Sequence, residues 1–126
     1  MKFGIDFHGV INKNPSLFVA LSHALVDAGH EVHIITGPRR SIVEPQLRAY
    51  GISFTHFFSI VEYEEARGLH NIEWIENNPF MDRAVWDLAK SDYCREQGID
   101  LHIDDSTKYG EHFTTPFAHF RNEGHK

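Results

Sequence analysis

The chain has 126 residues, with 18 acidic residues, 12 basic residues, ten histidines and one cysteine. This length predicts one domain over 1–126 with a single hydrophobic core, and the formal net charge of −6 offers no basic surface for nucleic acid or an anionic membrane. A lone cysteine cannot form an internal disulfide, and no signal peptide or membrane-length apolar run is recognisable. We therefore expect a soluble, cytoplasmic protein.

Strand-like and helix-like apolar patterns alternate along the chain, which predicts an α/β, three-layer Rossmann-like domain with a mainly parallel central sheet. The first half predicts, in chain order, a strand over 2–7, a helix from Pro15 to a stop at Gly29, a strand over 31–36, a helix over 38–50 that Pro45 either kinks or delays, and a strand over 53–60.

The second half gives weaker patterns. Segment 61–80 predicts loop with short helical pieces and is too short for a folded lid. The elements expected after it are a partly helical segment over 82–97 closed by Gly98, a strand over 99–103 and a short edge strand over 116–120.

Polar residues lie at the ends of three of the predicted strands. Asp6 lies at the carboxyl end of the first strand, Thr36-Gly37 at that of the second, and Asp104-Asp105 at that of the strand over 99–103. In an open parallel sheet, ligands bind beyond the carboxyl ends of the strands, where the strand order reverses. The sequence therefore places its candidate site at this edge of the sheet.

Three converging carboxylates would repel one another, and a hard divalent cation such as Mg²⁺ would offset that repulsion. A carboxylate beside such a metal is a competent nucleophile toward phosphorus. The Thr36 hydroxyl could then donate to a phosphoryl oxygen, helped by the backbone N–H groups that follow it. A lysine is needed for the remaining charge, and Lys90 is the first candidate, with Lys108 the second.

These residues resemble the four motifs of the haloacid dehalogenase superfamily, in order and over nearly the whole chain. The matching stretches are Asp6-Phe7-His8-Gly9-Val10, Ile34-Ile35-Thr36-Gly37, Lys90 and Ile103-Asp104-Asp105-Ser106. The resemblance, which is to small members without a cap domain, implies that Asp6 is the nucleophile, that Thr36 and Lys90 hold the phosphoryl group, and that Asp6, Asp104, Asp105 and the backbone carbonyl of His8 bind Mg²⁺.

His8 departs from the superfamily pattern, because phosphatases of this kind usually carry a second aspartate at this position as general acid and base. A histidine with a pKa near 6.5 can perform both roles. Two alternatives remain open: the side chain is idle and only good leaving groups react, or turnover has been lost and phosphate binding kept.

Each of these residues also has an ordinary structural interpretation. Asp6 could cap a turn, and Thr36-Gly37-Pro38 is a common type of connection between a strand and a helix. Arg39 follows Thr36 closely enough to bind a substrate phosphate, or it is simply solvated. His33 and His102 lie inside predicted strands and are expected to pack there, and the spacing of the histidines does not favour zinc.

The leading functional hypothesis is a Mg²⁺-dependent phosphomonoesterase or phosphotransferase that works through an aspartyl phosphate at Asp6. The alternative is a weak or inactive domain of the same family that binds a phosphate ligand or a protein partner. A signalling receiver domain is rejected, because there the acid pair follows the first strand and the lysine comes last. Substrate size is not indicated, and the aromatic stretches 54–58 and 113–120 permit a homo-oligomer.

Overall fold

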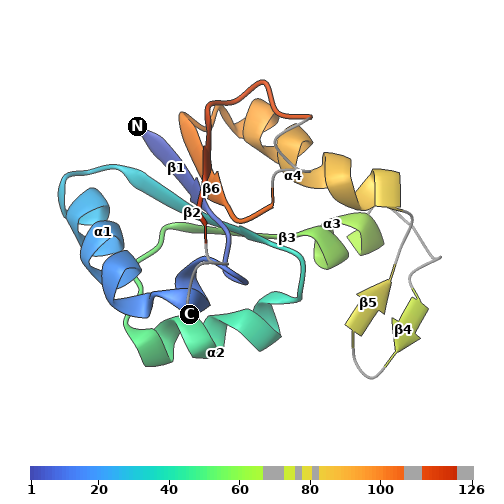
Figure 1. Cartoon of the computed structure of the whole chain (residues 1–126), viewed down its shortest axis with the longest axis horizontal. Helices are drawn as coiled ribbons and strands as arrows, with labels where there is room; N and C mark the ends of the chain where they lie inside the picture. The colour runs from blue at the N-terminus through green and yellow to red at the C-terminus, as the bar shows by residue number, and fades with distance from the viewer. Residues whose placement is uncertain (67–72, 76–77, 81–82, 107–111, 122–126) are drawn as a thin grey trace.

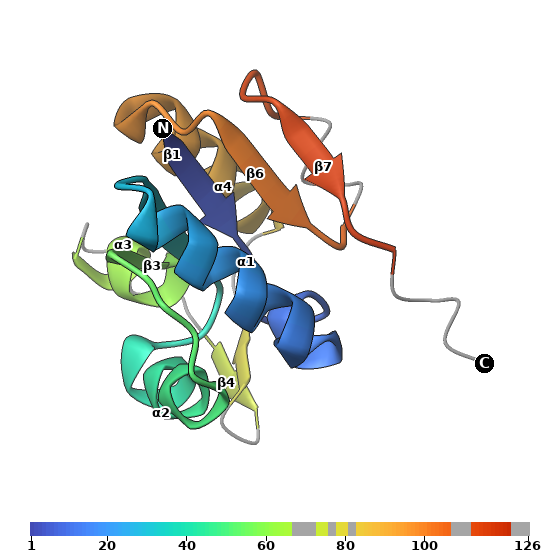
Figure 2. The ribbon, with the colours of Figure 1, turned by 90° about the vertical axis from the view of Figure 1, so that its left-hand side faces the viewer.

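A computed structural model describes residues 1–66, 73–75, 78–80, 83–106 and 112–121. Its centre is a five-stranded sheet in the order β3-β2-β1-β6-β7, in which every neighbouring pair is parallel (Figure 1). The strands are β1 (Lys2–Ile5), β2 (Glu31–Thr36), β3 (His56–Ser59), β6 (Leu101–Asp104) and β7 (Phe117–His119). Figure 2 shows β1, β6 and β7 side by side and running the same way.

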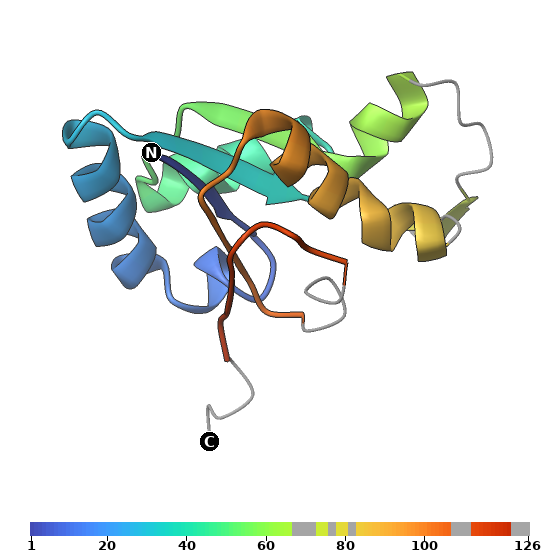
Figure 3. The same ribbon diagram turned by 90° about the horizontal axis from the view of Figure 1, so that it is seen from above.

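Helices cover both faces of this sheet. α1 (Pro15–Asp27) and α2 (Arg40–Tyr50) lie on one face, and α3 (Ile60–Ala66) and α4 (Arg83–Gln97) lie on the other (Figures 1 and 3). The architecture is thus a three-layer, Rossmann-like α/β fold, as the alternating patterns predicted. None of the helices in the described part of the chain is long and apolar enough to cross a bilayer.

The two helices on the first face begin and end with ordinary capping signals. Before α1, the Asn14 side chain accepts a hydrogen bond from the backbone N–H of Leu17, with proline at the first helical position. α2 begins at Arg40 and Pro45 lies inside it, in the second turn, so the alternative of a start delayed to the proline was wrong. α2 ends at Gly51, whose φ of 83° is the left-handed conformation that favours glycine.

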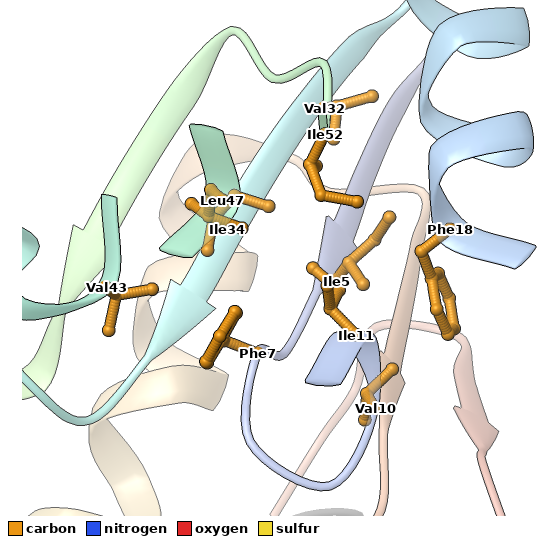
Figure 4. Packing of buried hydrophobic residues seen from close by; sticks show 10 residues of the cluster. All are labelled: Ile5, Phe7, Val10, Ile11, Phe18, Val32, Ile34, Val43, Leu47 and Ile52. Atoms are coloured by element: carbon orange, nitrogen blue, oxygen red, sulfur yellow. The ribbon is translucent and has the colours of Figure 1, made fainter. Parts of the chain in front are cut away.

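The core lies between the sheet and α1 and α2 (Figure 4). Apolar side chains of β1, β2 and both helices are fully or almost fully buried there, among them Ile5, Phe7, Phe18, Ile34, Val43 and Leu47. A second cluster, on the face of α3 and α4, includes Ile35, Ile60, Ala89 and Cys94. The late aromatic stretch packs within the chain, since Phe120 meets Phe18 edge-on with ring centroids 5.4 Å apart.

The prediction for residues 53–80 was wrong in two respects. The third strand covers only His56–Ser59, because the Ser59 hydroxyl accepts a hydrogen bond from the Glu62 N–H at 3.2 Å and the chain turns into α3. The segment over 61–80 contains α3, which confirms the short helical pieces predicted there, but also a separate antiparallel pair that was not predicted, β4 (Glu73–Ile75) and β5 (Asn78–Phe80). Pro79 is compatible with β5 because a two-stranded ribbon has only edge strands. Residues 67–72 and 76–77 lie outside the described chain.

The strand order reverses between β1 and β6. β2 and β3 continue the sheet on one side of β1, and β6 and β7 continue it on the other. Ile5 pairs with both Ile34 of β2 and Ile103 of β6. Asp6 therefore follows a strand that has a neighbouring strand on each side. The edge beyond this point is where doubly wound sheets bind their ligands.

Gly4→Ala tests the packing of the central strand. A Cβ at Gly4 would lie 2.7 Å from both His102 Nδ1 and Ile35 Cδ1, and these two buried side chains have little room to move. We expect a loss of about 2–3 kcal/mol in the free energy of unfolding, measured by urea denaturation. Gly29→Ala is the control, since only backbone strain of about 1 kcal/mol arises there. Equal losses in the two variants would refute the steric explanation.

Candidate active site

Three carboxylates meet at the switch point of the sheet. Asp6, Asp104 and Asp105 each place one oxygen so that the three oxygens lie within 4.8 Å of one another. The backbone N–H of Asp6 donates to the carbonyl of Ile103 at 3.0 Å, which holds the start of the turn after β1 against the end of β6. The fold thus brings together acids that are about a hundred residues apart in the sequence.

Lys90 of α4 lies between two of these acids. Its Nζ is 3.3 Å from Asp6 Oδ1 and 2.8 Å from Asp104 Oδ2, and its side chain is only 3% exposed. A buried ammonium needs such partners, because desolvation of an unpaired charge costs several kcal/mol. Of the two lysines that the sequence suggested, the structure brings Lys90 to the acids, and Lys108 lies outside the described residues.

The pKa values of the two carboxylates that contact Lys90 are shifted in opposite directions. Burial raises the pKa of Asp6 to about 7; Lys90 opposes that rise, and the charges of Asp104 and Asp105 add to it. Burial also acts to raise the pKa of Asp104, but the hydrogen bond from His102 and the charge of Lys90 outweigh it and hold this pKa well below its usual range. Asp104 is therefore a stable anion, whereas the charged form of Asp6 is destabilised.

Thr36 and Gly37 lie at the end of β2, next to β1. Within the described part of the chain, the buried Thr36 hydroxyl has no hydrogen-bond partner, and an unsatisfied buried polar group is costly. The carbonyl of Gly37 accepts hydrogen bonds from the Ser59 hydroxyl at 3.1 Å and from the Val61 N–H at 3.2 Å. These bonds fix the loop that begins at Gly37 against the start of α3, so Thr36 is held at the edge of the sheet.

Arg39 is engaged elsewhere in this structure. Its guanidinium forms a two-pronged ion pair with the Glu65 carboxylate on α3, and the neighbouring backbone N–H of Arg40 donates to Glu62. The pair with Glu65 uses two of the five guanidinium N–H donors and holds Arg39 toward α3. The acidic side chains of α3 instead hold the start of α2.

His8 is exposed on the turn after β1, with its ring edge-on to Phe7 at a centroid distance of 5.1 Å. Partial desolvation and the charge of Lys90 lower the pKa of His8 below its ordinary 6.5, and the charge of Asp105 opposes them. The ring therefore lies within electrostatic range of Lys90 and of the acid cluster.

His102 belongs to the site in a way that the sequence analysis missed. The residue packs inside β6 as expected and is fully buried, but its Nε2 also lies 3.0 Å from Asp104 Oδ2. A signal was present, because residues two apart in a strand point to the same face of the sheet. His102 and Asp104 have this spacing.

A second group of potential metal ligands, Glu31, His33 and His56, lies on β2 and β3. Spacing along the chain did not indicate it, because the pairing of His33 with His56 across two strands creates it. The two imidazoles stack with centroids 4.2 Å apart and planes at 5°, so their in-plane lone pairs do not converge on one ion. His33 also bonds Glu31 at 2.8 Å and the Tyr93 hydroxyl at 2.7 Å, an arrangement that satisfies a buried imidazole.

No protein-family model matches the chain, and no curated protein matches it. The chemistry must therefore be inferred from the site itself. Three carboxylates and a buried lysine at the switch point, with an unsatisfied hydroxyl at the end of the neighbouring strand β2, can bind a divalent cation and an anionic group together.

Asp6→Asn and Asp104→Asn should have opposite effects on the stability of the metal-free protein. The pKa of Asp6 is raised from 3.8 to about 7, so its contribution to stability is present below the lower value and is lost as the pH rises through the higher one. At pH 8, Asp6→Asn should raise the free energy of unfolding by about 1–3 kcal/mol. Asp104→Asn should lower it by about 3 kcal/mol, because Lys90 loses its closer partner.

Urea denaturation in the presence of a chelator measures both effects, and the gain from Asp6→Asn should shrink as the pH is lowered. Similar losses from both substitutions at pH 8 would show that the electrostatic assignment of the two carboxylates is wrong.

Proposed function

We propose that the protein is a Mg²⁺-dependent phosphomonoesterase or phosphotransferase that works through an aspartyl phosphate at Asp6. The observation that carries this proposal is the convergence of Asp6, Asp104 and Asp105 within 4.8 Å of one another, with Lys90 buried against two of them. Solubility does not require acids to be buried together, whereas phosphoryl transfer requires a nucleophile, a cation and positive charge at one place.

The donor set fits a hard cation. Among the described residues, the three candidate side-chain ligands of the acid cluster are all carboxylates, whose oxygens Mg²⁺ prefers to nitrogen or sulfur. Asp6, Asp104, Asp105 and the backbone carbonyl of His8 would hold the ion. When bound, Mg²⁺ would neutralise phosphate charge and lower the pKa of Asp6, which makes that carboxylate available as a nucleophile.

The residues of the chain divide the remaining work. An oxygen of Asp6 forms a bond to phosphorus while the bond from phosphorus to the leaving oxygen breaks, and water later cleaves the aspartyl phosphate. Lys90 and the Thr36 hydroxyl offset charge on the phosphoryl oxygens, with Gly37 providing the backbone turn behind Thr36. His8 gives a proton to the leaving oxygen and takes one from the attacking water.

The resemblance of four stretches to the haloacid dehalogenase motifs supports the same assignment, since the fold brings Asp6, Lys90 and the acid pair to one edge. The histidine at position 8 favours one alternative, a weak or inactive domain that binds a phosphate ligand or a protein partner. We further propose that the substrate is a phosphorylated molecule and that the protein acts in the cytoplasm.

The activity test is hydrolysis of an aryl phosphate, followed with and without Mg²⁺ between pH 5 and 8. We expect turnover that requires Mg²⁺ and falls by at least about 10³-fold in Asp6→Asn, because the nucleophile is lost. Asp92→Asn is the matched control, since Asp92 pairs with Arg95 on the exposed side of α4. Equal background rates from the wild type and Asp6→Asn would leave the alternative function and exclude the enzyme.

His8→Ala should distinguish leaving groups. An alkoxide needs a proton as it departs and an aryloxide hardly does, so we expect a loss of about 10²-fold on alkyl phosphates and only a few-fold on aryl phosphates. The ratio of the two kcat/KM values is the measurement. His8→Asp, which restores a carboxylic acid at this position, should recover part of the alkyl activity. Equal losses on both substrate classes would contradict the role of His8 as leaving-group acid.

A further inference from the structure

His102 is a fully buried imidazole beside the acid cluster, and the chemical steps above make no use of it. It lies on β6 two residues before Asp104, so the two side chains point to the same face of the sheet. Its Nε2 lies 3.0 Å from Asp104 Oδ2, and neither side chain is exposed to solvent.

The ring is held from both sides. On one side is Gly4 of β1, which pairs with His102 across the sheet, and an added Cβ there would come within 2.7 Å of the imidazole Nδ1. On the other side, the Phe113 ring stacks on the imidazole with centroids 5.2 Å apart and planes at 18°, and Phe117 lies tilted against it at 5.9 Å. The glycine and the two aromatic rings therefore restrict the movement of the imidazole.

This fixed ring restricts the carboxylate of Asp104. Asp104 Oδ2 lies 3.0 Å from His102 Nε2 and accepts a hydrogen bond from Lys90 Nζ at 2.8 Å. Asp104 Oδ1 accepts a hydrogen bond from the backbone N–H of Ser106 at 3.1 Å. Donors from β6, α4 and the loop after β6 set the plane of the carboxylate. A ligand oriented in advance loses less freedom when a cation binds, and outer partners of this kind typically change metal affinity 10–100-fold.

We propose that His102 is a positioning residue for the cation site: its Nε2–H fixes the Asp104 carboxylate for Mg²⁺, and Gly4 and Phe113 hold the imidazole for this purpose. The proposal rests on the proposed function only in taking the cation to be Mg²⁺ bound by Asp104. Because a carboxylate only accepts hydrogen bonds, Nε2 must carry a proton.

The proton on Nε2 can be observed directly in the unmodified protein. Long-range ¹H–¹⁵N NMR spectra of the metal-free protein at pH 7.5 should show His102 protonated at Nε2, with a signal that shifts when Mg²⁺ is added. A bare Nε2, with the proton on Nδ1 alone, would overturn the proposal, because that nitrogen could not donate to Asp104. This measurement needs no substitution, so it decides the question even if variants of this buried residue fail to fold.

Two substitutions separate positioning from packing. His102→Met fills a similar volume without a donor, whereas His102→Gln keeps an amide donor near the place of Nε2. We expect calorimetric titration with Mg²⁺ alone to give a dissociation constant 10–100-fold weaker for the methionine variant and within about three-fold of wild type for the glutamine variant. Circular dichroism and thermal melts verify that both variants are folded.

The outcomes distinguish this proposal from the proposed function. If the wild type and His102→Met bind Mg²⁺ equally well, His102 does not position Asp104, while the proposed phosphoryl transfer stands. If both folded variants weaken Mg²⁺ binding to the same extent, the effect is one of packing, and the positioning role is again refuted. If the wild type binds no Mg²⁺, the cation of the proposed function and the role of His102 fail together.

Discussion

The interaction on which this site depends is the buried ammonium of Lys90 between the carboxylates of Asp6 and Asp104. Two like charges this close to each other, away from water, would repel strongly, and one buried cation reduces that repulsion without abolishing it. Burial, together with the remaining negative charge, raises the pKa of Asp6, while Asp104 stays ionised. The site therefore favours the binding of further positive charge, and a divalent cation is the simplest species that supplies it.

Topology creates this arrangement. Because β1 is central and the strand order reverses beside it, the turn after β1 and the end of β6 reach the same edge of the sheet from opposite ends of the sequence. α4 covers one face of the sheet and supplies Lys90. Phe113, which follows β6 in the chain, stacks on His102. The proposed cation site and the packing of the sheet thus share His102, so a change at Gly4, which pairs with His102, affects both.

Local patterns predicted the fold well where burial dominates. Alternating apolar periods identified β2 and α1 closely, and they predicted a parallel sheet with Asp6, Thr36 and Asp104 at strand ends. Over 53–80 these patterns did not predict β4 and β5, because short elements give no periodicity. They also made the third strand too long, because a serine cap decides where it ends. The role of Glu65 could not be predicted from the sequence, because only the fold brings it near Arg39. The contact of His102 with Asp104 could have been predicted, because residues two apart in a strand point to the same face of the sheet.

The most direct test of the central claim is a crystal structure of the protein with Mg²⁺ and beryllium trifluoride, which mimics a phosphoryl group on an aspartate. The account predicts beryllium bound to an Asp6 oxygen, one Mg²⁺ ion shared by Asp6 and Asp104, and Lys90 Nζ within hydrogen-bond distance of a fluoride. Beryllium trifluoride on another residue, or an ion that contacts only one of the two carboxylates, would contradict it.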